Sequence, residues 1–127
     1  MNYLLDTNIC VFVIRQKSQA IVRRLRTHDA GDLGISAVTL AELRYGAGKS
    51  QDPAKNHAAL DAFVAPLTIA EFGAEAADQY GKVRADLERR GVPIGPLDTM
   101  IAAHALSVNV KLVTNNTREF ARVGVPA

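Results

Sequence analysis

The stretch Tyr3-Leu4-Leu5-Asp6-Thr7-Asn8 decides how the rest of the chain is interpreted. Leu4 and Leu5 form a short apolar run bounded by polar residues, which is typical of a buried strand. A carboxylate directly after such a strand lies where open α/β sheets bind their ligands. Asp6 and Thr7 are also ordinary N-cap residues, so a purely structural role for them stays open. The chemical interpretation requires further carboxylates at matching positions.

The composition is that of one globular domain, which we assign to residues 1–127. The 127 residues are 48% hydrophobic and 22% charged, which is enough for one core. No apolar stretch reaches the length of a membrane span, and the N-terminus lacks the pattern of a signal peptide, so we expect a cytoplasmic protein. The one cysteine, Cys10, excludes an internal disulfide and a cysteine-based zinc site, and its apolar neighbours predict a core position.

Basic residues are concentrated in one early segment. The formal net charge is only +2, from 15 basic and 13 acidic residues, which is weak evidence for a nucleic-acid partner. Clustered arginines can nevertheless form a patch that faces phosphates. A solvated helix face has the same composition and remains the alternative. The candidate RNA contacts are Arg15, Lys17, Arg23 and Arg24.

The remaining apolar runs alternate with helical patterns. Strands are expected near residues 33–35, 66–69 and 111–114, and helices near 37–47, 74–90 and 99–107, with two more after Asp6 and Ser18 and one from Pro53. Strands that alternate with helices predict a parallel sheet covered by helices on both faces. We therefore predict a single-domain α/β/α sandwich with a central parallel sheet of four to five short strands.

Two more acids lie in predicted helices. Glu42 shares a helical face with Val38 and Tyr45. An acid in such a stripe is costly to bury without a partner, unless it lies at the edge of the stripe and points to water. Asp98 follows the rigid connector 92–96, near a helix N-terminus where the helix dipole favours a carboxylate in any role.

The fourth predicted strand ends at Thr114 and runs into a polar loop. Asn116 and Glu119 in this loop could face the same edge of the sheet as Asp6, although an Asn-rich turn has the same composition.

His104 lies among alanines in the middle of a predicted helix. We interpret it as a partly buried packing histidine, since no second histidine stands at ligand spacing.

The acids of this chain predict a metal site. Asp6, Asn116 and Glu119 follow strands, and Glu42 and Asp98 are expected within the first turns of helices, so all five can approach one sheet edge. Carboxylates without a cysteine pair or a histidine cluster select Mg²⁺ or Mn²⁺. Such ions activate water and stabilise the oxygens of a phosphodiester, which predicts metal-dependent hydrolysis. The predicted catalytic and metal-binding residues are Asp6, Glu42, Asp98 and Glu119, supported by Thr7, Asn8, Thr114 and Asn116.

Four blocks in register carry a family resemblance. The chain resembles the PIN-domain ribonucleases and, within them, the VapC toxins of prokaryotic toxin–antitoxin pairs. By this resemblance Asp6, Glu42 and Asp98 match the three leading acids. Many relatives carry an aspartate soon after the strand-end threonine, where this chain has Asn116, so Glu119 is expected as the fourth carboxylate. The blocks are residues 5–8, 36–43, 95–105 and 112–120.

The resemblance also implies an activity and partners. It implies an endoribonuclease that depends on Mg²⁺ or Mn²⁺, cuts structured RNA, often tRNA, and stops translation. It implies a cognate VapB-type antitoxin whose C-terminal segment fills the acidic cleft through an arginine or lysine, and homodimers or toxin–antitoxin hetero-oligomers. Members of the family commonly extend a little beyond the position of Ala127.

Two other interpretations compete with the nuclease. A phosphoacceptor receiver domain also places an aspartate at a strand end beside Mg²⁺, but it wants a lysine at the end of a late strand, whereas Lys111 begins one. A PIN-like module that binds RNA or protein with weakened catalysis is the alternative that the Asn116 departure supports.

Overall fold

One parallel sheet organises the chain. The computed structural model describes residues 1–15 and 19–124, and within them four strands pair in the order β3-β2-β1-β4. All three pairings are parallel, with β1 between β2 and β4. This confirms the predicted fold class. The strands are β1 (Tyr3–Leu5), β2 (Leu33–Ser36), β3 (Thr68–Ala70) and β4 (Lys111–Val113).

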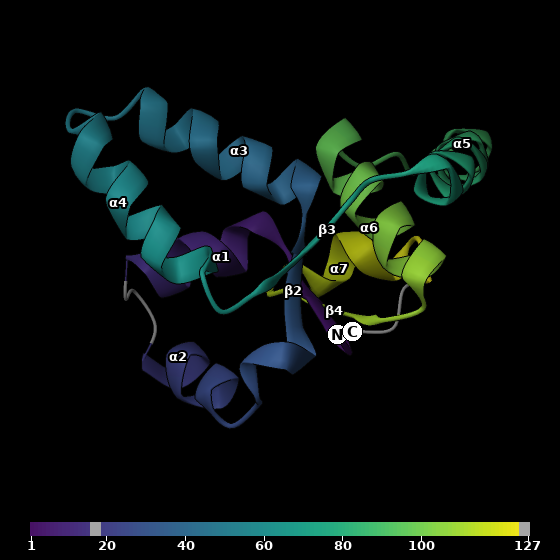
Figure 1. Cartoon of the computed structure of the whole chain (residues 1–127). Helices are drawn as coiled ribbons and strands as arrows, with labels where there is room; N and C mark the ends of the chain where they lie inside the picture. Colours follow the sequence, from purple (N-terminus) through teal and green to yellow (C-terminus); the bar gives the residue numbers. More distant parts are fainter. Residues whose placement is uncertain (16–18, 125–127) are drawn as a thin grey trace.

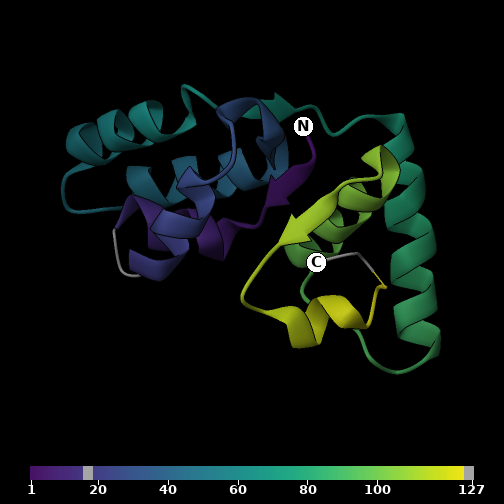
Figure 2. The ribbon, with the colours of Figure 1, turned by 90° about the horizontal axis from the view of Figure 1, so that it is seen from below.

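Helices cover both faces of the sheet. Figures 1 and 2 show α1 to α4 on one side of the strands and α5 to α7 on the other. Each crossover between neighbouring strands contains at least one helix, as parallel pairing requires. The helices are α1 (Thr7–Ile14), α2 (Gln19–Arg26), α3 (Ala37–Gly48), α4 (Pro53–Val64), α5 (Ala74–Arg89), α6 (Pro96–Val108) and α7 (Thr117–Ala121), with a 3₁₀ turn η1 (Ala30–Asp32) before β2.

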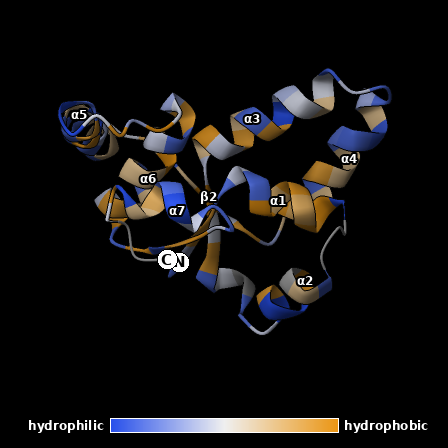
Figure 3. Ribbon diagram, turned by 180° about the vertical axis from the view of Figure 1, so that it is seen from behind, coloured by the Kyte–Doolittle hydropathy of each residue, from blue (hydrophilic) through white to orange (hydrophobic). Residues whose placement is uncertain are grey.

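The strand β1 feeds two separate hydrophobic cores. Leu4 packs with residues of α6, α7 and β4, whereas Leu5 packs with residues of α1, α3 and α4. Successive side chains of a strand point to opposite faces, so two adjacent leucines supply both cores. Figure 3 shows apolar residues along β2 and α1, in the middle of the molecule. Cys10 is fully buried in the second core, as predicted.

Several element boundaries differ from the prediction. The helix α6 begins at Pro96 instead of Thr99, because proline is favoured in the first helical turn and Gly95 serves as N-cap. Asp98 is therefore the third helical residue. Glu42 is the sixth residue of α3 and so lies in its second turn; the prediction of a first-turn position was wrong.

The chain after β4 forms a helix that the sequence did not predict. The short helix α7 occupies residues 117–121, where only a polar loop was expected. Phe120 of α7 is buried against α6 and β4, and this anchor explains why the segment is helical. The predicted N-cap Ser18 lies outside the described residues. Among the described helices, none has the length and apolar character needed to cross a bilayer.

Candidate active site

Asp6 occupies the junction between the central strand β1 and the helix α1. It is the N-cap of α1, and its Oδ1 accepts the backbone N–H of Ile9 at 2.8 Å. Its Oδ2 accepts the hydroxyl of Thr114, which follows the neighbouring strand β4. Asp6 therefore caps the helix and also lies at the predicted sheet edge. A carboxylate bound on both oxygens is fixed in one orientation.

The surroundings of Asp6 disfavour its negative charge. The side chain is only 2% exposed, and burial raises the pKa of this carboxyl. The hydrogen bonds from Thr114 and Ile9 act in the opposite direction, and the carboxylate of Glu42 raises the pKa further. Asp6 is thus a carboxylate held in place close to another acid.

Glu42 reaches the same place from the second turn of α3. The helix begins at Ser36, whose hydroxyl accepts the backbone N–H of Val38 at 3.1 Å. Glu42 is half-buried, and its Oε1 accepts the hydroxyl of Thr7 at 2.7 Å. The residue after Asp6 therefore orients Glu42. This contact shows that the side chain does not simply point to water.

Asp98 stands in the first turn of α6. Its carboxylate is half-buried, and burial is the main reason that its pKa is raised. The carboxylates of Glu119, Glu42 and Asp6 raise it further, in that order. The structure thus brings the four predicted acids close enough to interact electrostatically, although they come from four segments of the chain.

Glu119, the fourth predicted acid, is positioned by Asn116, which in turn contacts Thr114. The backbone N–H of Asn116 donates to the hydroxyl oxygen of Thr114 at 2.9 Å. The side-chain amide of Asn116 donates to Oε2 of Glu119 at 2.8 Å. A continuous chain of hydrogen bonds therefore runs from Asn116 through Thr114 to Asp6. The asparagine that departs from the family pattern positions the neighbouring glutamate.

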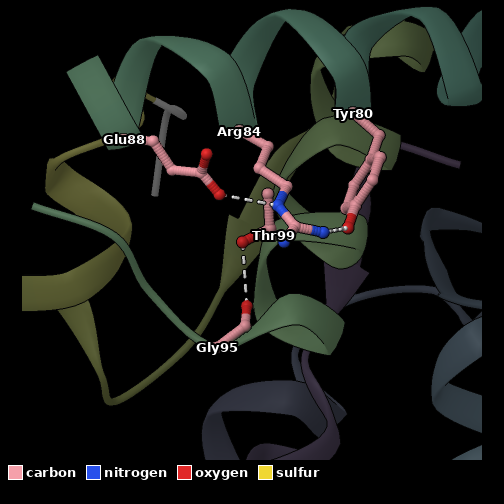
Figure 4. A network of polar contacts seen from close by, with 5 residues as sticks. All are labelled: Tyr80, Arg84, Glu88, Gly95 and Thr99. Carbon is pink, nitrogen blue, oxygen red and sulfur yellow. Dashed lines mark hydrogen bonds and ion pairs between the residues drawn. The ribbon is translucent and has the colours of Figure 1, made fainter.

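Figure 4 shows α5 beside the start of α6, with polar contacts formed within each segment. Arg84 on α5 donates to Glu88 at 2.9 Å and to the hydroxyl of Tyr80 at 2.8 Å. Thr99 donates to the backbone carbonyl of Gly95 at 2.8 Å, which closes the first turn of α6. The bond from Thr99 stabilises the helix end that carries Asp98.

A buried histidine links the two helices that carry Glu42 and Asp98. His104 on α6 is 1% exposed, so it is fully buried instead of partly buried as predicted. Its Nδ1 lies 2.7 Å from the hydroxyl oxygen of Ser36, the N-cap of α3. Burial lowers the pKa of the imidazole, which is therefore neutral at pH 7. Sequence reasoning missed this pair, because 68 residues separate its members.

The carboxylate, hydroxyl and amide oxygens around Asp6 are the type of ligand that a hard cation prefers. Among residues 1–15 and 19–124, no three His, Cys, Asp or Glu side chains are arranged as a ready-made metal cage. The acids instead bond to Thr7, Thr114 and Asn116. The pKa values of Asp6 and Asp98 are raised in part by neighbouring carboxylates, and a nearby cation would stabilise the charged forms of these two acids. Mg²⁺ completes its coordination with water. The described side chains can therefore serve such an ion through a few carboxylates.

Within the described ranges, the remaining predicted residues lie at the surface. Asn8 is exposed in the first turn of α1, and Arg15, Arg23 and Arg24 are also exposed. Arg15 is the C-cap of α1, whereas the other two arginines belong to α2. Lys17 lies outside the described residues. The structure leaves the proposed RNA contacts of this segment as predictions.

Comparisons with known proteins show the family to which this chain is related. The PIN domain family model matches residues 3–126. A tRNA(fMet)-specific endonuclease VapC of Shigella flexneri is 48% identical over 98% of this chain and 93% of its own length. The DNA-bound VapBC structure from Salmonella typhimurium contains a chain that is 41% identical, with a TM-score of 0.93, covering 99% of this chain and 95% of that one.

A third relative comes from a further organism. The DNA-bound VapBC2 structure from Rickettsia felis contains a chain that is 40% identical, with a TM-score of 0.90, covering 99% of this chain and 94% of that one. The similarity extends over the sheet, the helices and all four segments that carry the acids. The chain therefore belongs to the PIN domain family, within its group of VapC ribonucleases.

Proposed function

We propose that this chain is an endoribonuclease toxin that uses Mg²⁺ or Mn²⁺, cuts tRNA and thereby stops translation in the cytoplasm. The observation that carries the proposal is the convergence of Asp6, Glu42, Asp98 and Glu119 at the carboxyl end of the central strand. The relative from Shigella flexneri is named a tRNA(fMet)-specific endonuclease, which supports tRNA as substrate.

The four acids would hold the ion, which when bound supplies an activated water and stabilises charge on the phosphodiester oxygens. Asp6 is fixed by two donors, from Ile9 and Thr114. Thr7 orients Glu42 in the same way. Side chains that are fixed before the substrate arrives need little rearrangement during the reaction. The hydroxyls and the amide around the acids therefore preorganise the site.

A PIN-like binding module with weakened catalysis is the other candidate. Its support is Asn116, which stands where many relatives have an aspartate. The structure gives this asparagine a positioning contact with Glu119, and Glu119 in turn acts on the pKa of Asp98. This contact favours the enzyme.

The relatives also suggest a protein partner. The similar chains from Salmonella typhimurium and Rickettsia felis were solved as VapBC complexes bound to DNA. We propose that this chain likewise binds a cognate VapB-type antitoxin, forming a hetero-oligomer that contains a toxin homodimer. Co-purification with the product of an adjacent antitoxin reading frame, and loss of RNA cleavage in the complex, would support this.

An RNA cleavage assay tests the enzymatic proposal. Purified protein with Mn²⁺ or Mg²⁺ should cut tRNA, and Asp98→Asn should lower the rate about 10²–10³-fold, the range for losing one group that stabilises transition-state charge. Asp78→Asn is the matched control, because Asp78 is exposed on α5. Equal cleavage by parent and Asp98→Asn would reject the proposal. Calorimetric titration with Mn²⁺ alone should show weakened binding in the same variant.

A further inference from the structure

A hollow of about 250 Å³ leads away from the acids between α1, α3 and α4. Thr7 and Glu42 line the end that adjoins the site. Arg15 and Lys49 line it as well, and Asn56 on α4 adds a polar group. The rest of the lining is mostly aliphatic. The hollow therefore offers apolar surface and cationic groups directly beside the proposed catalytic residues.

The length of the hollow suits a short stretch of nucleic acid. Thr7 and Arg15 stand at opposite ends of α1, eight residues and about 12 Å apart. Lys49, the C-cap of α3, lies two turns beyond Glu42 on the same side of that helix. At about 3.4 Å per stacked nucleotide, this length corresponds to three or four nucleotides. A strand with one phosphate at the acids would therefore reach both cations.

The cationic side chains of the hollow lie at the surface. Arg15 and Lys49 are both exposed. In the described part of the chain, ion pairs form at Arg44, Arg84 and Arg90, and neither residue takes part in one. When a cationic side chain binds a phosphate, counterions condensed on the nucleic acid are released, and this release strengthens binding.

An exposed aromatic ring stands beside Lys49. Tyr45 is 69% exposed, and the Lys49 ammonium lies 4.9 Å from its ring centroid. Tyr45 is three residues after Glu42, on the same side of α3. Cations interleaved with an aromatic ring are the pattern by which proteins bind single-stranded nucleic acid. The pattern favours RNA over an acidic peptide, because a peptide segment does not require the stacking surface.

We propose that this hollow binds the RNA strand that flanks the cut phosphate. Arg15 and Lys49 contact its phosphates, and the Tyr45 ring stacks on one of its bases. The inference rests on the proposed nuclease function and adds the path that the bound RNA strand follows away from the acids.

Binding of tRNA by Asp98→Asn protein, which is expected to cut about 10²–10³-fold more slowly than the parent, tests the inference. In this background Lys49→Gln should weaken binding and lower the slope of log affinity against log salt by about 0.7. Tyr45→Ala should weaken binding about five- to 100-fold, whereas Tyr45→Phe should retain it. Lys82→Gln is the matched control, since Lys82 is exposed on α5, on the opposite side of the molecule from α4 (Figure 1).

The outcomes separate this inference from the nuclease proposal. If Lys49→Gln and Tyr45→Ala bind tRNA like Lys82→Gln, while Asp98→Asn slows cleavage by about 10²–10³-fold, the subsite is wrong and the nuclease stands. If both variants lower only the affinity for the antitoxin, the hollow is a protein interface and the inference is overturned. If they weaken tRNA binding while Asp98→Asn cuts as fast as the parent, the RNA site stands and the assignment of the acids fails.

Discussion

The bond between Ser36 and His104 should contribute more to stability than an ordinary helix cap. The Ser36 hydroxyl oxygen accepts the N–H of Val38, so its own hydrogen is free to donate to Nδ1 of His104. Ser36→Ala removes the cap and also leaves a buried nitrogen without a partner. Losing a cap costs about 0.5–2 kcal/mol, and an unpaired buried polar group costs about 1–3 kcal/mol. We therefore expect Ser36→Ala to lower the free energy of unfolding by about 2–4 kcal/mol.

A double-mutant cycle isolates the contact. His104→Leu removes the polar partner, so the double variant has lost the cap but no longer buries an unpaired nitrogen. Its loss of stability should be smaller than that of the two single variants combined, with a coupling energy of about 1–2 kcal/mol. Urea unfolding of the four proteins measures this directly. His104→Leu alone leaves the Ser36 hydroxyl without an acceptor but also removes Nε2 of His104, which is buried without a hydrogen-bond partner, so the coupling energy and not the single effect measures the contact.

Asp52→Ala is the matched control for the helix cap. Asp52 caps α4 by accepting the N–H of Lys55 at 3.2 Å, and it is exposed. Its removal should cost about 1 kcal/mol and add to the effect of His104→Leu without coupling. The reasoning would be refuted if Ser36→Ala cost no more than Asp52→Ala, or if its effect were additive with that of His104→Leu.

Three further predictions follow from other contacts. Burial lowers the pKa of His104, so this imidazole takes up a proton more readily in the unfolded chain than in the folded one. The stability that the neutral His104 contributes should be complete above about pH 6.5 and lost as the pH falls below that value. In urea unfolding, the stability of His104→Leu should therefore depend less on pH than that of the parent. Thr7→Val should weaken Mn²⁺ binding about 10- to 100-fold in calorimetry by releasing Glu42, while the thermal midpoint stays nearly unchanged. Gly34→Ala should cost about 1–3 kcal/mol in urea unfolding, because the added methyl would overlap the Met1 sulfur at 2.0 Å and the Thr68 carbonyl oxygen at 2.9 Å; unchanged stability would contradict it.

The sequence predicted the architecture because parallel strands and their crossovers leave local signals. Leu4 and Leu5 are followed at once by polar capping residues, and the same pattern recurs at Ser36 and after Val113. The acids were located for the same reason, since each follows a strand or stands early in a helix. Their catalytic roles remain predictions.

Other features depend on packing between distant segments and had no local signal. The alanines around His104 predicted that it is partly buried, but only the packing of α6 against the start of α3 brings it to Ser36. Similarly, the contact between Thr7 and Glu42 requires α1 and α3 to lie side by side. The helix α7 forms because Phe120 finds a place in the core, which composition alone could not show.

Asp6 is both a proposed ligand and a structural anchor, and this has a consequence for anyone who wants an inactive version of the protein. Replacing Asp6 with alanine would remove the N-cap of α1, so a loss of activity could come either from the missing carboxylate or from a destabilised fold. Asparagine caps a helix about as well as aspartate, so Asp6→Asn would discharge the group while leaving the Ile9 amide satisfied. The dual role also means that random inactivating changes at this position would carry a folding penalty, which would make them visible to the cell's quality control as well as to selection on toxicity.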